Sequence, residues 1–173
     1  MFRTITLAGF FAGFGTVAAF AHVSLETKEA PVDSTYKAVF RVPHGCDGKA
    51  TTAVRIKIPE GAIDAKPMPK AGWKLETVKG KYTKSYTLWG EAVSEGVLEV
   101  NWSGGNLPDE FYDEFVLRLR LTGDLPVGET LRFPVVQECE GGAAARWIEI
   151  PAVGQDEDAL EHPAPGIKLL PKK

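Results

Sequence analysis

Apolar residues recur at every second position through most of this chain. In the clearest run, Phe115, Leu117, Leu119 and Leu121 are separated by a valine and two arginines. A period of two is typical of strands that bury one face. The same alternation predicts further strands within residues 36–42, 54–58, 84–89, 98–102, 131–135 and 147–150.

Short clusters of turn-forming residues separate these runs. Each contains Gly, in two of them with Pro, and they lie at residues 43–45, 59–61, 70–72, 103–106 and 140–142. Strands and turns that alternate about every ten residues are typical of a β-sandwich. Since no stretch has the pattern of a long helix, we expect a single all-β domain with an immunoglobulin-like antiparallel β-sandwich.

The first 21 residues resemble an export signal. Arg3 precedes an apolar stretch over residues 5–17, and Ala19-Phe20-Ala21 has small residues at the two positions that a signal peptidase reads. The apolar stretch is short for a membrane anchor, which needs about 20 residues. We therefore expect cleavage after Ala21 and a periplasmic or secreted protein with no stable membrane anchor.

The remaining chain is expected to form one domain over residues 22–153, followed by a Pro-rich, loosely ordered tail over residues 154–173. The full sequence of 173 residues carries a formal net charge of −3. A protein that binds nucleic acid usually has a basic excess, so we expect no nucleic-acid partner. Motifs of the common enzyme classes are also missing, and we expect a protein that is not an enzyme.

The two cysteines are expected to form a structural disulfide. Cys46 lies in a predicted loop and Cys139 at a predicted strand end. Outside the cytosol such a pair tends to oxidise, and the CxxC spacing of redox and metal sites is missing. A bond across so long a loop contributes about 4–5 kcal/mol in the chain-entropy model.

Cleavage after Ala21 would make His22 the first residue of the mature chain. A free N-terminal histidine offers its α-amine and an imidazole nitrogen, which together can chelate one metal ion. Nitrogen ligands of this kind suit Cu(II), which stands highest among the divalent ions in affinity. The only methionine after residue 21 is Met68, so a Met-rich Cu(I) site is excluded within the mature chain.

Several motifs, in order, resemble the YcnI-like copper-binding domain family. They are His22-Val23-Ser24-Leu25 after the cleavage site, Arg41-Val42-Pro43-His44-Gly45-Cys46, Pro69-Lys70-Ala71-Gly72-Trp73, residues 107–115, residues 133–137 and Arg146-Trp147-Ile148-Glu149. The resemblance implies an exported β-sandwich that binds Cu(II) through its N-terminal histidine, a carboxylate and a nearby tryptophan. Trp147 matches that tryptophan.

Three glutamates are candidates for the carboxylate. Glu149 is favoured because residues two apart on a strand share a face, and Trp147 is two residues away. Glu138 is the alternative across the predicted 140–145 turn, where it could face Trp147 as a cross-strand neighbour. Glu29 is seven residues from His22, too far along an extended strand unless the chain bends at Pro31.

The leading hypothesis is a periplasmic copper chaperone or buffer that exchanges one copper ion with copper-trafficking proteins. One alternative is a copper oxygenase of the histidine-brace type, in which His44 or His162 would supply a second imidazole to the His22 site. Without a copper preference, the chain would be a β-sandwich interaction module that happens to begin with histidine, which the fold alone permits.

Overall fold

The computed structural model describes residues 22–173, so the predicted export signal over residues 1–21 lies outside the described part. Regular structure in residues 22–173 consists of strands and two single 3₁₀ turns, η1 (Glu140–Gly142) and η2 (Glu157–Ala159). In this part of the chain, no helix has the length and apolar character needed to cross a membrane.

The strands form three sheets. A four-stranded sheet has the order β1 (Ser24–Leu25), β3 (Ser34–Val42), β8 (Asp113–Leu121), β5 (Ala62–Pro67). A five-stranded sheet has the order β11 (Ala144–Trp147), β10 (Val135–Cys139), β4 (Thr51–Lys57), β7 (Glu91–Leu107), β6 (Lys74–Leu88). A small third sheet has the order β2 (Glu29–Pro31), β12 (Gly166–Leu170), β9 (Thr130–Arg132).

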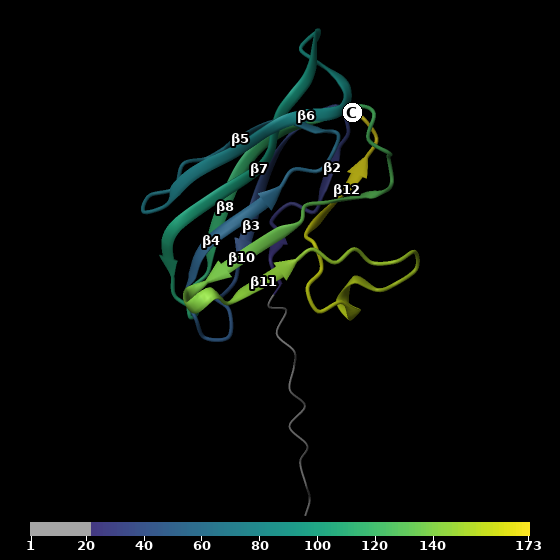
Figure 1. The fold of residues 1–173 in the computed structure, drawn as a ribbon. Coiled ribbons are helices and arrows are strands. Elements are labelled where there is room, and N and C mark those ends of the chain that lie inside the picture. The colour runs from purple at the N-terminus through teal and green to yellow at the C-terminus, as the bar shows by residue number, and fades with distance from the viewer. Residues whose placement is uncertain (1–21) are drawn as a thin grey trace, which may run out of the picture.

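The two larger sheets pack face to face as a sandwich (Figure 1). Trp102 of β7 and Phe115 of β8 belong to opposite sheets, and their ring centroids lie 5.6 Å apart. Both side chains are fully buried. The far end of the β6–β7 hairpin projects beyond the body of the sandwich (Figure 1). The predicted β-sandwich is therefore confirmed.

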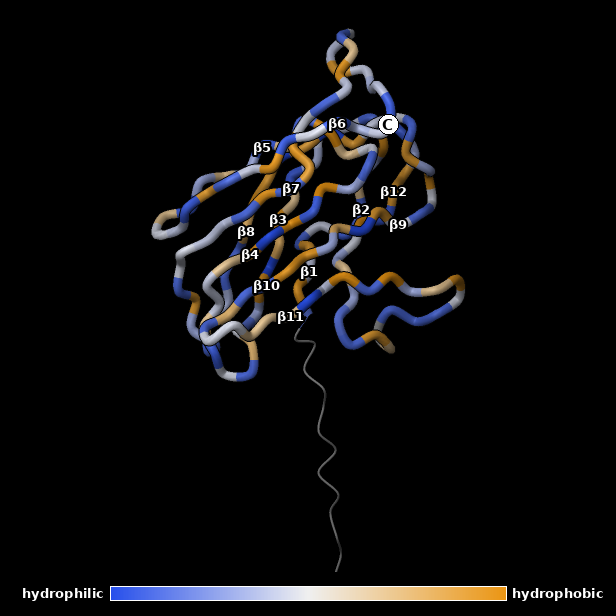
Figure 2. Tube along the Cα trace, viewed as in Figure 1, coloured by the Kyte–Doolittle hydropathy of each residue, from blue (hydrophilic) through white to orange (hydrophobic). Residues whose placement is uncertain are grey.

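The period-two pattern accounts for the core. β3 and β8 pair so that Phe40 lies opposite Phe115 and Ala38 opposite Leu117, and all four side chains are completely buried. Figure 2 shows the resulting alternation of apolar and polar positions along the strands. Since one face of each strand is buried, a slip of one residue would expose the whole apolar set, and this fixes the register.

The strand predicted over residues 131–135 is two strands in different sheets. β9 ends at Arg132 and β10 begins at Val135. Between them, Phe133 donates its N–H to the Pro165 carbonyl, and the Pro134 carbonyl accepts from Lys57 N–H. Pro134 has no N–H to donate to a continuous ladder, so the chain changes sheets at this point.

The tail expected to be loosely ordered is instead part of the fold at its C-terminal end. β12 lies between β2 and β9, parallel to β2, and its Ile167 and Leu169 are buried. These two apolar residues are separated by Lys168, a short period-two signal that the surrounding prolines and charges obscured. The expected domain end at residue 153 is therefore wrong, since the folded body continues through Leu170.

Replacing Leu169 by Ala is expected to lower the free energy of unfolding by about 2–5 kcal/mol, because the side chain is 1% exposed and its loss leaves a cavity. Lys168→Ala, at the exposed position next to it, is the matched control and should change stability by less than about 0.5 kcal/mol. Urea denaturation measures both. Equal stability of the two variants would show that β12 adds nothing to the core.

Candidate metal centre

His22 stands at the start of the folded domain, at the edge of the four-stranded sheet. The next residues enter β1, where Ser24 pairs with Arg41 of β3. Val23 and Leu25 are buried, whereas His22 and Ser24, at the alternate positions, are half-buried. The alternation of β1 thus places the His22 side chain on the less buried side of an anchored segment.

Trp147 meets His22 from the edge of the other large sheet. It is the last residue of β11, lies opposite Val135 of β10 and is 4% exposed. Its ring centroid lies 5.6 Å from that of His22, with the rings tilted by 57°. The pairing of His22 with Trp147 expected from the family resemblance is therefore present in the structure, where the edge strands β1 and β11 approach each other.

A second histidine contacts the same indole. The His162 ring centroid lies 4.8 Å from that of Trp147, and the rings are tilted by 48°. His162 lies in the segment between η2 and β12, which the sequence analysis assigned to the loosely ordered tail. The sequence indicated either a second copper ligand or an exposed tail residue at His162; its position beside Trp147 depends on the buried strand that follows it.

Glu149 fastens this returning segment to the end of β11. One carboxylate oxygen accepts the His162 N–H at 2.6 Å, and the Glu149 carbonyl accepts the Ala164 N–H at 2.8 Å. Glu149 also forms a parallel bridge with Pro163. The side chain is exposed, so the favoured carboxylate lies near Trp147 and has a structural contact of its own.

The other two predicted carboxylates lie elsewhere. Along β10, Val135, Gln137 and Cys139 are buried with Trp147, and Glu138 alternates to the opposite face. There Glu138 forms an ion pair with Arg55 at 2.9 Å, so the expectation that it faces Trp147 is wrong. Glu29 is exposed on β2 in the third sheet, where it lies opposite Lys168 in the parallel ladder with β12.

A cleft of about 610 Å³ opens beside His22. Besides His22, it is lined by two carboxylate residues, Asp156 and Glu157, and by two lysines, Lys28 and Lys168. Glu157 also pairs with Arg132 at 2.7 Å, which connects η2 to β9. Sequence analysis missed both acids, because their acidic, Pro-flanked surroundings resemble an ordinary solvated loop.

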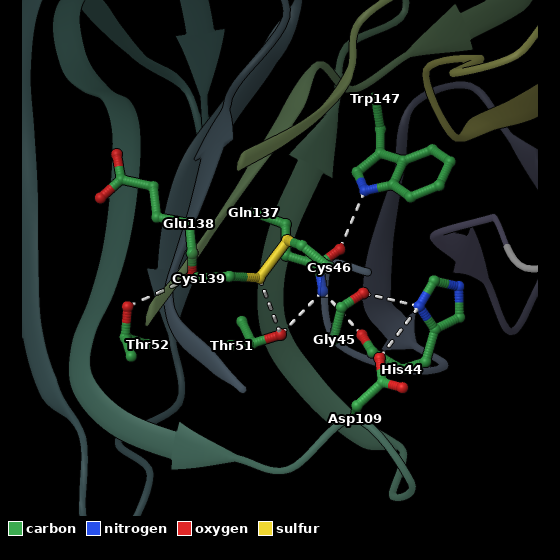
Figure 3. Close-up of a disulfide and its surroundings, with 10 residues drawn as sticks. All are labelled: His44, Gly45, Cys46, Thr51, Thr52, Asp109, Gln137, Glu138, Cys139 and Trp147. Carbon is green, nitrogen blue, oxygen red and sulfur yellow. Dashed lines mark hydrogen bonds and ion pairs between the residues drawn. A yellow bond between two sulfur atoms is a disulfide. The ribbon is translucent and has the colours of Figure 1, made fainter. Parts of the chain in front are cut away.

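The two cysteines form the predicted disulfide, with their Cα atoms 6.0 Å apart (Figure 3). A tight turn presents Cys46: Asp47 and Gly48 have φ values of 50° and 80°, and Cys46 exchanges backbone hydrogen bonds with Lys49. Two successive residues with positive φ are typical of a type I′ turn, for which Asp-Gly is a preferred pair.

His44 belongs to this disulfide loop. Its Nδ1 donates to the Gly45 carbonyl at 2.6 Å and lies 3.9 Å from a carboxylate oxygen of Asp109 (Figure 3). These contacts fix the ring within the loop. They agree with the interpretation of His44 as a turn residue near the disulfide.

A buried amide connects this loop to the indole. Trp147 Nε1 donates to Gln137 Oε1 at 3.1 Å, and Gln137 Nε2 donates to both Thr51 Oγ1 and the His44 carbonyl at 2.7 Å (Figure 3). Sequence analysis missed Gln137. Its signal was a polar residue at an inward position of β10, between Val135 and Cys139.

Side chains alone do not make a complete metal site here. Within residues 22–173, no group of three or more His, Cys, Asp or Glu side chains lies close enough together to hold a metal ion. An N-terminal chelate, however, draws one of its nitrogens from the main chain, and this nitrogen becomes an amine only after cleavage. An imidazole and an amine of His22 with one carboxylate from the cleft are donors of the kind that Cu(II) accepts.

Comparisons with known proteins identify a family and solved structures that are similar to this chain. A family model described as "Domain of unknown function (DUF1775)" matches residues 22–169. The crystal structure of an uncharacterized protein from Nocardia farcinica, reported to have an immunoglobulin-like fold, is similar with a TM-score of 0.62 and 28% identity. The similarity covers 87% of this chain and 99% of that chain, which confirms the predicted immunoglobulin-like fold. No curated protein gives a significant match.

Removing the disulfide by a Cys46→Ala/Cys139→Ala double substitution is expected to lower the free energy of unfolding by about 4–5 kcal/mol. The cysteines are 93 residues apart in sequence, so the bond strongly restricts the unfolded chain. Guanidinium denaturation of the oxidised protein and the variant measures the difference. A change below about 1 kcal/mol would mean that native strain cancels the loop-closure effect.

Proposed function

Because the chain belongs to the DUF1775 family, the YcnI-like family that its motifs indicated, we propose that it is an exported protein that carries one Cu(II) ion as cargo. The His22 amine and imidazole form the chelate, and a carboxylate from the adjacent cleft completes it. The protein acts as a copper chaperone or buffer in the periplasm. Its localisation rests on the export pattern of residues 1–21.

The contact between His22 and Trp147 is the observation that carries this proposal. A first residue without a role would not need a defined packing position. The His22 imidazole nevertheless packs against a buried indole where the edges of two sheets meet. The buried Val23 and Leu25 anchor the backbone that follows His22. A preorganised chelate loses less conformational entropy when it binds a metal ion.

The cleft makes Asp156 and Glu157 better candidates for the carboxylate than the sequence-based choice, Glu149. Both acids line the same cleft as His22, although Glu157 also pairs with Arg132. Glu149 is not among the residues that line the cleft; it accepts the His162 N–H and fastens the segment that carries the two acids. In this arrangement Glu149 supports the site, and one of the two cleft acids supplies the oxygen ligand.

The position of His162 favours a second candidate function, a copper oxygenase with two histidines. His162 and His22 contact the same indole, so a modest rearrangement would bring a second imidazole toward the metal. Under this hypothesis His162→Ala weakens Cu(II) binding as strongly as loss of the amine. Under the carrier hypothesis the same substitution has a small effect.

The processed protein is expected to bind one Cu(II) ion per chain, and a form with one extra residue before His22 to bind about 100-fold more weakly. The extra residue keeps the imidazole but converts the chelating amine into an amide. Isothermal titration of mass-verified samples against Cu(II), with a competing chelator, measures both affinities.

His44→Ala is the matched control for this titration, because it removes an imidazole from the disulfide loop but keeps the backbone carbonyl that accepts from Gln137, and it should leave the affinity unchanged. Equal binding by the native and extended forms would rule out the chelate. The chain would then be better described as an interaction module with an incidental histidine.

Neutralising one cleft acid, by Asp156→Asn or Glu157→Gln, is expected to weaken Cu(II) binding about tenfold, because an amide oxygen is a poorer ligand than a carboxylate. Glu149→Gln keeps an acceptor for the His162 N–H and should have a smaller effect. Glu138→Gln, on the opposite face of β10, is the control. The largest loss in Glu149→Gln would instead identify Glu149 as the ligand.

A further inference from the structure

Gln137 is a fully buried polar side chain in an otherwise apolar setting. It is 0% exposed, and its neighbours on the same face of β10, Val135 and Cys139, are also buried. A buried amide is costly unless its hydrogen-bonding groups are satisfied. The partners of Gln137 therefore indicate what the residue does.

We propose that Gln137 is a positioning residue that fixes the Trp147 indole beside His22, and that copper affinity depends on it. Thr51 and the loop of the disulfide hold Gln137 in turn (Figure 3). The effect on copper rests on the proposed function, whereas the placement of the indole can be measured without any metal.

The amide has one orientation that satisfies every partner. The indole N–H can only donate, so it requires the amide oxygen of Gln137. The two hydrogens of Nε2 are then used by Thr51 Oγ1 and by the His44 carbonyl. A flipped amide would direct its NH₂ group at the indole N–H and its oxygen at a carbonyl, so both contacts would become repulsive.

Trp147 needs such an anchor because of its place in the sheet. It is the last residue of an edge strand, and Ile148 and Glu149 beyond it are exposed. The β10 ladder holds its backbone and the core packs against the ring, but apolar contacts are not directional and do not orient the indole N–H. The indole has a single donor group, and Gln137 occupies it.

Both donor contacts of Gln137 lead to the disulfide. Thr51 pairs with Cys139 in the β4–β10 ladder, and its Oγ1 lies 3.8 Å from Cys139 Sγ. His44, whose carbonyl accepts the other hydrogen, is two residues before Cys46. The disulfide thus joins β10, which carries Gln137, to the segment over residues 44–51 that supplies both acceptors, so the indole is placed by a cross-linked frame.

The test compares Gln137→Met, Thr51→Val and Thr51→Ser with the native sequence, all as processed, metal-free protein. Gln137→Met removes all three hydrogen bonds and could fail to fold; Thr51→Val removes one acceptor, and Thr51→Ser keeps the hydroxyl. The readouts are NMR hydrogen exchange of the Trp147 Nε1–H and cross-relaxation between the His22 imidazole and the Trp147 indole. The Trp102 Nε1–H, bonded to the Met68 carbonyl, is the internal control.

We expect exchange at Trp147 to be about tenfold faster in Thr51→Val, with loss of the cross-relaxation to His22, and no change at Trp102. Thr51→Ser should behave like the native protein, a rescue that a general loss of stability would not produce. In Cu(II) titrations, Thr51→Val should bind about tenfold more weakly, as is typical when a group that orients a metal site is removed.

Unchanged exchange and cross-relaxation at Trp147 in Thr51→Val would overturn the proposal. So would a displaced indole in a variant that binds Cu(II) as tightly as the native protein. If the native protein itself binds no copper, the proposed function fails on its own, and the metal-free measurements still decide whether Gln137 positions Trp147.

Discussion

Burial of one apolar face on each large sheet is the constraint on which the other features depend. Because side chains alternate along a strand, the segment that buries Val23 and Leu25 must leave His22 on its less buried side. The same rule turns Trp147 inward at the end of β11. The two residues meet because each lies at the edge of its own sheet, where the sandwich brings those edges together.

The polar connection behind this meeting point follows a different rule. A buried amide lowers stability unless each of its polar groups has a hydrogen-bond partner. Its contribution to a site is therefore to orient neighbouring side chains rather than to add stability. Gln137 has a partner for each group, and these partners come from β4, the disulfide loop and β11. The apolar core sets where the strands lie, and this amide sets how one ring is turned at their end.

Periodicity predicted the sandwich and most of its core strands, though not β5 or the short strands β1 and β2, and the export pattern with two cysteines predicted the disulfide. Periodicity could not show that Pro134 divides one apolar run between two sheets, since the sheet to which a strand belongs depends on partners that are distant in sequence. Nor could it show that Ile167 and Leu169 form a strand that carries His162 to the indole. The candidate carboxylate ligands were the hardest residues to choose between, because the sequence pattern of an exposed acid is the same whether it lines a cleft or faces open solvent.

The parallel pairing of β2 with β12 also bears on when this protein can fold. Residues 29–31 find their partner in the third sheet only at residues 168–170, almost the whole length of the described chain away. Contacts so distant in sequence form late and slow folding, because a long loop must close before they add stability. Because a chain is synthesised from its N-terminus, the third sheet cannot form completely until β12 has been made and is free to pair. β2 therefore stays without its β12 partner until the chain has been synthesised, and has crossed any membrane, as far as residue 170.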